Sequence, residues 1–197
     1  MLTIYQRQAH LKYLGLYKGK LDGIEGKLTK KAYKDLQNKY FTRKKDRDGV
    51  YGKDTDILLV NAYRVKYYTK NFKLEEFRCE CKGYCTGYPE YLSVTFLKNA
   101  QKLRDKFGAL TITSGLRCEK ENSIVGGIKG SKHTKGKAFD CYNRAYSSLA
   151  GRKKIVNYWI KLRGSSYSYC NGYGRSKWRK TYPNVPTMGN AVHCDVK

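Results

Sequence analysis

The sequence has no long hydrophobic run. Its longest aliphatic stretch is Ile57–Val60, far shorter than the ~20 apolar residues that span a bilayer. The first residues, Met1–Arg7, contain no apolar segment of the length found in signal peptides. We therefore expect a chain that is synthesised in the cytoplasm without a signal peptide and that has no membrane span.

Acidic residues are also scarce. There are 16 Asp and Glu residues against 41 Lys and Arg residues, which gives a formal net charge of +25. A field of this sign attracts polyanions, both nucleic acids and the anionic polymers of bacterial walls. The basic residues are spread along the chain, and no recognition-helix or zinc-finger spacing accompanies them. Nucleic-acid binding is therefore the weakest hypothesis, and the 19 tyrosines favour a globular protein over a disordered one.

The seven cysteines cannot all pair within the chain, and without a secretion signal we expect reduced thiols. Cys79, Cys81 and Cys85 form a tight C-x-C-x3-C cluster but lack the usual paired CxxC spacing. Two interpretations stay open. The cluster binds a structural zinc ion if a fourth ligand joins it, or it consists of free thiols near a turn.

A repeat marks the N-terminal third. Asp22–Thr29 (DGIEGKLT) returns as Asp48–Thr55 (DGVYGKDT). The glycines of each copy suit a tight turn with positive φ, and each threonine is predicted to cap a helix by accepting from its first free N–H groups. Apolar residues at helical spacing follow each copy and also precede the first. The pattern predicts three short helices joined by glycine turns.

This unit, from about Tyr5 to Arg64, resembles the family known as peptidoglycan-binding domain 1. The resemblance rests on Gln6 or Gln8 in the first helix, the two DGxxGxxT turns, and Gln37 at the end of the second helix. It implies a module that binds bacterial peptidoglycan. The alternative is a helical bundle with no affinity for the wall, because a fold does not fix a function.

Histidine is rare, with three in the chain. His10 lies in the first predicted helix, and we assign it no role. His133, Asp140 and His193 together offer two imidazoles and one carboxylate, the kind of N/O set with which hydrolytic zinc sites leave a fourth position for water. His133 and Asp140 are seven positions apart, so a glycine-rich loop must bring them to one metal ion.

The same residues lie in motifs that resemble the M15 family of D-Ala-D-Ala metallopeptidases, which includes phage endolysins and carboxypeptidases. The matching motifs, spread over about Phe72–Lys197, are Ser114–Arg117 (SGLR), Asn122, Val125–Gly127, Ser131–Asp140 (S-x-H-x-x-G-x-A-x-D) and Val192–Asp195 (V-H-x-D). The resemblance implies that His133, Asp140 and His193 hold Zn²⁺. It also implies that Arg117 and Ser131 face the substrate.

Peptide hydrolysis with zinc-activated water also needs groups that stabilise charge and move protons. Arg117 suits an oxyanion forming at the scissile carbonyl. Many M15 members place an acidic residue three positions before the last zinc histidine, where this chain has Asn190. We therefore predict Asp195 as the general base, since residues two apart in a strand share a face. Its alternative role is to orient a zinc ligand, and Glu119 and Glu121 are remoter candidates.

The expected fold class is α+β. We predict a three-helix domain at 1–66, a linker at 67–73, and at 74–197 a zinc peptidase domain with a small antiparallel sheet. Within the latter, the pattern predicts helices at Tyr91–Phe107 and Ala150–Leu162 and a strand at Leu110–Thr113. The tyrosines and the tryptophan before His193 could line a substrate groove or pack in the core, and the sequence is compatible with both roles.

The leading hypothesis is therefore a monomeric, modular, endolysin-like peptidoglycan hydrolase that acts at the bacterial cell wall. Its alternatives are a D,D-carboxypeptidase and a wall-binding protein that keeps zinc without turnover, for which Asn190 is the main argument.

Overall fold

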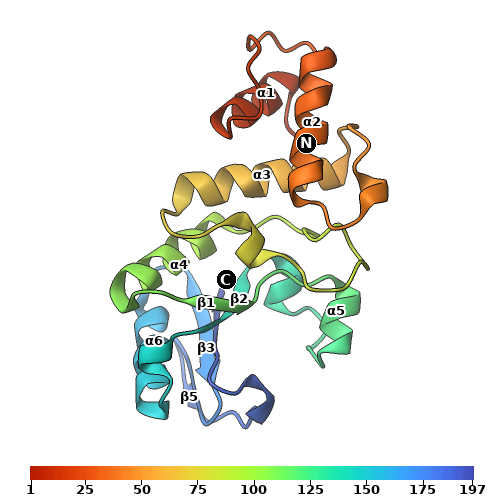
Figure 1. The fold of residues 1–197 in the computed structure, drawn as a ribbon. Helices are drawn as coiled ribbons and strands as arrows, with labels where there is room; N and C mark the ends of the chain where they lie inside the picture. The colour runs from red at the N-terminus through yellow and green to blue at the C-terminus, as the bar shows by residue number, and fades with distance from the viewer.

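The computed structural model describes all 197 residues and combines six α-helices with one antiparallel sheet of six strands. The α-helices are α1 (Ile4–Tyr13), α2 (Lys27–Tyr40), α3 (Lys53–Tyr68), α4 (Val94–Phe107), α5 (Glu119–Ile124) and α6 (Leu149–Lys161). The strands are β1 (Thr111–Ser114), β2 (Ala138–Tyr142), β3 (Ser165–Cys170), β4 (Tyr173–Ser176), β5 (Lys180–Thr181) and β6 (Val192–Val196). The predicted α+β class is confirmed. Figure 1 shows α1–α3 stacked on one end of the remainder.

The repeated turns of the N-terminal unit are each held by one buried glutamine. Gln8 Nε2 donates to Asp22 Oδ1, the Ile24 carbonyl and Thr29 Oγ1 at 2.7–3.3 Å. Gln37 makes the same three contacts with Asp48, Val50 and Thr55 at 3.0–3.1 Å. In both turns the glutamine Oε1 accepts the N–H of the positive-φ glycine. The sequence repeat is therefore also a repeat of structure.

The prediction that Thr29 and Thr55 cap helices is wrong. The N-caps of α2 and α3 are Gly26 and Gly52, and neither offers a side-chain cap. Each threonine is the third residue of its helix, in the first turn, where its hydroxyl donates back to the carbonyl of Ile24 or Val50. The reason is that each threonine hydroxyl already accepts a hydrogen bond from the buried glutamine. The threonine therefore connects the turn to the first turn of the helix and does not cap the helix.

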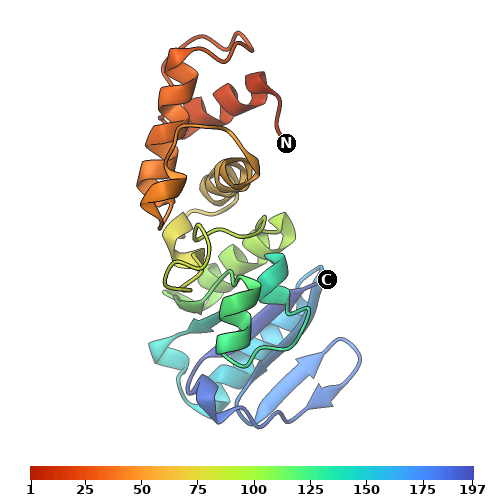
Figure 2. The same cartoon turned by 90° about the vertical axis from the view of Figure 1, so that its right-hand side faces the viewer.

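The N-terminal unit packs closely on the rest of the chain. Asn61 of α3 donates to the Glu90 carbonyl at 2.9 Å and accepts from the Leu92 N–H at 2.7 Å. Tyr91 Oη donates to Asp56 Oδ2 of α3 at 2.6 Å. The hydrophobic core is one cluster of 33 residues that runs from Leu11 to Val196. Figure 2 shows α3 lying directly against the α4 region, and this continuity fixes the orientation of the two parts.

Tertiary contacts set the ends of the later elements. α4 begins at Val94, three residues after the predicted start, because the backbone of Leu92 is bound to Asn61 and Ser93 caps the helix through Phe96 N. The strand predicted at Leu110–Thr113 is β1 at Thr111–Ser114, and the helix predicted at Ala150–Leu162 is α6 at Leu149–Lys161. α3 extends to Tyr68, into the segment predicted as a linker. No helix of the chain combines the length and the apolar character that a bilayer crossing requires.

The strand order is β1-β2-β6-β3-β4-β5, with every neighbouring pair antiparallel. β6, which comes last in the chain, is therefore central. Figure 1 shows α6 on one side of the sheet and α5 on the other. On the α6 side, Trp159 packs against Phe139 with ring centroids 5.5 Å apart. Alternation along β2 and β6 then directs Asp140 and His193 to the opposite face.

Candidate metal centre

The site begins as a row of side chains across four strands. Ser114 of β1 is paired with Asp140 of β2, Asp140 with His193 of β6, and His193 with Tyr169 of β3. Directly paired residues lie on the same face of a sheet, within contact distance. The row therefore collects a hydroxyl, a carboxylate, an imidazole and a phenol on the face opposite α6. Asp195, two residues after His193, is on this face as well.

His133 reaches the row from a short 3-10 turn, η3 (Lys132–Lys135). The turn is fixed at both ends. Ser131 Oγ accepts the N–H of His133 at 3.3 Å, and Gly136 ends the turn in the left-handed region with φ 62°. A Cβ at Gly136 would lie 2.0 Å from the Tyr91 carbonyl oxygen. The glycine of the S-x-H-x-x-G motif is thus required both for its φ and for the close approach of this backbone.

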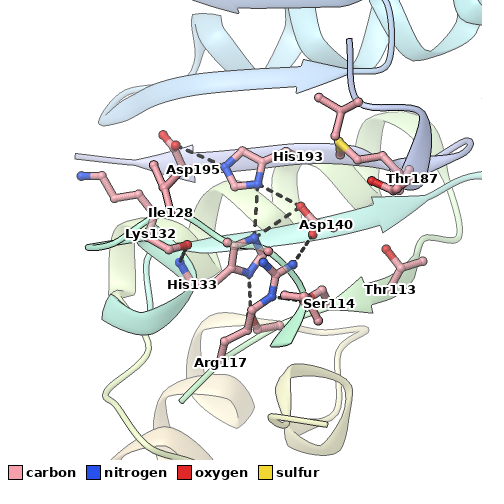
Figure 3. Close-up of a pocket in the computed structure, with 18 of the residues that line it drawn as sticks. Thr113, Ser114, Arg117, Ile128, Lys132, His133, Asp140, Thr187, His193 and Asp195 are labelled. Carbon is pink, nitrogen blue, oxygen red and sulfur yellow. Dashed lines mark hydrogen bonds and ion pairs between the residues drawn. The ribbon is translucent and has the colours of Figure 1, made fainter. Parts of the chain in front are cut away.

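Three ligand atoms face one another at the centre of the site (Figure 3). His133 Nε2 lies 3.3 Å from His193 Nδ1 and 3.4 Å from Asp140 Oδ1, and His193 Nδ1 lies 2.9 Å from that same oxygen. The tautomer of His133 is set by its other ring nitrogen, because Nδ1 donates to the Gly115 carbonyl at 2.7 Å. The structure therefore brings together the three residues predicted as metal ligands, although His193 lies 53 positions after Asp140.

Arg117 touches this triad through Asp140. Its Nη2 donates to Asp140 Oδ2 at 2.7 Å and its Nε donates to Ser114 Oγ at 2.8 Å. One carboxylate oxygen thus faces the histidines while the other is paired with the guanidinium, as the dashed lines in Figure 3 show. Arg117 lines the pocket beside the triad, so it can both neutralise Asp140 and face a substrate.

Asp195 contacts the opposite edge of His193. Its Oδ2 lies 3.3 Å from His193 Nε2, and its Oδ1 accepts the backbone N–H of Tyr167 at 2.7 Å. This is the contact expected of a residue that orients a ligand. The proton-accepting role of Asp195 stays a prediction. Glu121 lines the same pocket, while Glu119 is not among its lining residues.

Burial and charge move the pKa values of the triad in different directions. Burial lowers the pKa of His133, which favours its neutral form. Burial also disfavours charge on His193, but hydrogen bonds to Asp140 and Asp195 raise the pKa of His193 to about 9. Burial alone would raise the pKa of Asp140, yet hydrogen bonds from both histidines hold that pKa well below its usual range. Asp140 is therefore an anionic ligand at neutral pH.

The triad opens into a pocket of about 1020 Å³. Its walls come from the SGLR segment, the glycine-rich loop before η3, and the segment before β6. Ser131 lines it but is 8% exposed and holds His133, so the structure places this residue beside the site rather than in open solvent. A space of this size accommodates an oligopeptide segment.

The sequence left open whether the aromatic residues before His193 line a groove or pack in the core, and the structure distinguishes among them. Tyr169 packs against His193 with ring centroids 4.7 Å apart and the rings tilted by 30°, and both Tyr167 and Tyr169 line the pocket. Trp178 is 89% exposed away from it. Asn190 lines the pocket and accepts from Arg152 Nη1 at 2.6 Å. The period of two that places Tyr167 and Tyr169 on one face was the available signal.

The model of the Peptidase M15 family matches residues 70–156. The match contains His133 and Asp140, together with Arg117 and the glycine-rich loop, and it ends before β6. His193 and Asp195 therefore join the site through the fold rather than through the matched segment. No curated protein matches the chain. The matched segment and the geometry together support a zinc-dependent metallopeptidase.

The residues present fit such a metal. Ligand atoms at about 2.0–2.1 Å from a tetrahedral zinc ion lie about 3.3 Å apart, close to the 2.9–3.4 Å within the triad. Two imidazoles and one carboxylate match the ligand set of catalytic zinc sites, and the pocket leaves room for a further ligand. His133, Asp140 and His193 would hold the ion.

Proposed function

We propose that the chain is a modular peptidoglycan hydrolase of the endolysin type, which cleaves a peptide bond in the stem peptide or cross-link of the bacterial wall. The observation that carries this proposal is the convergence of His133, Asp140 and His193 at the floor of a pocket large enough for a peptide. The match to Peptidase M15 supports the same chemistry.

Zinc, when bound, supplies Lewis acidity toward a peptide carbonyl and lowers the pKa of water. The protein's own groups do the rest. Asp140 and His193 sit on paired strands, so the sheet fixes their separation. Arg117 places a permanent positive charge on the pocket wall, where it stabilises negative charge that develops on a substrate oxygen. A carboxylate must accept a proton and pass it to the leaving amine, and Asp195 is the residue that we predict for it.

The N-terminal unit is proposed to bind the peptidoglycan of the bacterial wall. Its two glutamine-locked turns are the features that resemble peptidoglycan-binding domain 1. Because the unit packs on α4, binding to the wall would keep the pocket close to its substrate and raise the effective substrate concentration. The net charge of +25 adds attraction to anionic wall polymers. Action at the cell wall follows from this arrangement.

The test is hydrolysis of purified peptidoglycan by the zinc-loaded chain, with fragments identified by mass spectrometry. We expect new amino termini that disappear with a chelator and in His133→Ala, and that persist in the matched control His10→Ala. Release of D-Ala alone would identify a D,D-carboxypeptidase. Full zinc content without release of any fragment would instead indicate a wall-binding protein that lacks turnover. The absence of an acid at Asn190, which is hydrogen-bonded to Arg152, would then explain the lack of turnover.

Wall binding is tested separately with the inactive full-length His133→Ala protein and insoluble peptidoglycan stripped of its anionic polymers. Co-sedimentation that survives the stripping supports a peptidoglycan-binding module. Binding that disappears with the polymers, and that falls with added salt, would assign the affinity to charge alone.

A further inference from the structure

A second group of metal-binding side chains lies outside the triad. Cys79, Cys81, Cys85 and Cys118 have sulfur atoms that all lie within 4.8 Å of one another. The first three form the C-x-C-x3-C cluster of the sequence. The fourth is the N-cap of α5, 33 positions after Cys85 in the chain, and it is brought in by the fold. The fourth ligand that the cluster lacked in the sequence is therefore present in the structure.

The spacing of the sulfurs suits one tetrahedral ion. Four sulfurs at about 2.3 Å from zinc lie about 3.8 Å from one another. Cys81 Sγ and Cys85 Sγ are 3.4 Å apart, well beyond the S–S bond of about 2.05 Å. Cys79 and Cys81 are 2% exposed and the other two are half-buried, so the group is shielded but reachable.

Every one of the four sulfurs also accepts a backbone N–H. Cys79 Sγ accepts from Cys118 N at 3.3 Å and Cys81 Sγ from Cys85 N at 3.2 Å. Cys85 Sγ accepts from Gly87 N at 3.3 Å, and Cys118 Sγ from Glu121 N at 3.4 Å. Four backbone donors directed at four sulfurs stabilise negative charge on those sulfurs, and metal ligation requires thiolates.

The loop backbone is shaped to make these contacts. Between Cys81 and Cys85 the chain passes through Lys82 at φ 52°, the one non-glycine residue with positive φ, and Gly83 at φ 99°. This left-handed turn folds the N–H of Cys85 back onto Cys81 Sγ. Left-handed backbone is unfavourable for a lysine, because its Cβ crowds the neighbouring carbonyl oxygen, and a bound ion would hold the turn closed.

We propose that Cys79, Cys81, Cys85 and Cys118 bind a second zinc ion, whose role is structural. All four ligand positions are filled by protein, so this site has no open position for water or substrate. The ion would tie the loop from Cys79 to Cys85 to Cys118 at the start of α5. Cys118 directly follows Arg117 of the pocket, and the Cys85 carbonyl and the Thr86 carbonyl accept from Thr42 of the N-terminal unit at 3.1 Å. The cluster thus joins the wall of the pocket to the proposed wall-binding unit.

Zinc content measured on the purified full-length protein tests this proposal. We expect two zinc ions per chain in the wild type, one in His133→Ala, one in Cys79→Ser, and two in the control Cys170→Ala, which removes a buried thiol outside the cluster. Cys85→His, which keeps a ligand, should retain both. One ion in the wild type, with no loss in Cys79→Ser, would overturn the proposal whatever the fate of the catalytic site.

A second measurement on the wild type avoids any variant that fails to fold. Thiol alkylation of the native protein should spare the four cluster cysteines until a chelator is added, and cobalt substitution should produce a thiolate-to-metal absorption band. Cysteines that become reactive only after a reducing agent is added would indicate disulfides and refute the site. Free reactivity of Cys85 and Cys118 without a chelator would refute it as well.

Discussion

Arg117 and Asp140 form an ion pair of 2.7 Å in which the carboxylate bridges the guanidinium to the metal-binding atoms. The same carboxylate faces His133 and His193 with its other oxygen. A change at Arg117 is therefore expected to act on both the metal and the substrate, and the two effects can be separated.

For Arg117→Lys we expect zinc affinity to fall by about 10–100-fold, because Asp140 loses the donor that fixes its orientation. Zinc competition with a chromogenic chelator measures this, with Arg152→Lys as the control, because Arg152 contacts Asn190 of the pocket wall but not the triad. Unchanged zinc affinity with a kcat lower by about 10²–10³-fold would instead show that Arg117 acts mainly on the developing oxyanion.

For Asp195→Asn we expect weaker zinc binding, again by about 10–100-fold, since Asp195 Oδ2 faces His193 Nε2. The measurement is zinc affinity together with the pH–rate profile at saturating zinc. Intact zinc affinity and loss of the acidic limb would assign the proton-accepting role to Asp195. Glu121→Gln is the matched comparison, because that carboxylate lines the same pocket.

The contact between the two parts of the chain should weaken in acid. Burial opposes ionisation of Asp56, but hydrogen bonds from Tyr91, Tyr51 and the Leu2 N–H hold the pKa of Asp56 below its usual value. A carboxyl with a depressed folded pKa stabilises the protein above its unfolded pKa, about 3.9, and loses that contribution as the pH falls through the folded value.

We therefore expect Asp56→Asn to lower the free energy of unfolding by about 1.5–3 kcal/mol at pH 7 and to show less loss of stability than the wild type below about pH 4. Denaturant unfolding at several pH values measures both. Asp35→Asn, at an exposed ion pair with Lys31, should change stability by less than about 1 kcal/mol. Parallel pH curves for wild type and Asp56→Asn would contradict the assignment.

The repeated glutamines offer a prediction about stability alone. Gln37→Glu keeps the shape of the side chain but removes the amide that donates to Asp48, Val50 and Thr55. We expect a loss on the order of 3 kcal/mol, and a similar loss for Gln8→Glu. Thermal unfolding measures it, and a substitution at either site without effect would show that the turns do not depend on their glutamines.

The sequence predicted the parts of the fold that local patterns determine. The repeat, the α4 and α6 segments and the glycine-rich loop before His133 all follow from periodicity and turn residues. The hydrogen bond between Gln8 and Thr29 could not be predicted from such patterns. A threonine near the start of a helix is normally interpreted as a cap, and the glutamine that binds this one lies 21 residues earlier in the chain. The late start of α4 has the same cause, because Asn61 holds the backbone of Leu92.

The candidate site divides in the same way. His133 and Asp140 share one motif, and their nearness follows from it. Cys118 stands alone in the sequence, so nothing in its spacing shows that it approaches Cys79. Its position directly after the SGLR segment was the one available signal. The contact of Asp195 with the Tyr167 N–H depends instead on the register of β6 and β3, which local sequence does not set.

The central place of β6 has a consequence for how the molecule folds. Strands β1-β2 and β3-β4-β5 meet only through β6, so before β6 is inserted each group has an open edge able to pair with another chain. Closure requires contacts between segments far apart in sequence, which is slow. Since His193 lies on β6 and Asp140 on the strand beside it, the triad exists only after closure. Zinc that binds to the triad therefore stabilises the closed sheet. The rate of zinc binding during refolding would then report the rate at which β6 inserts.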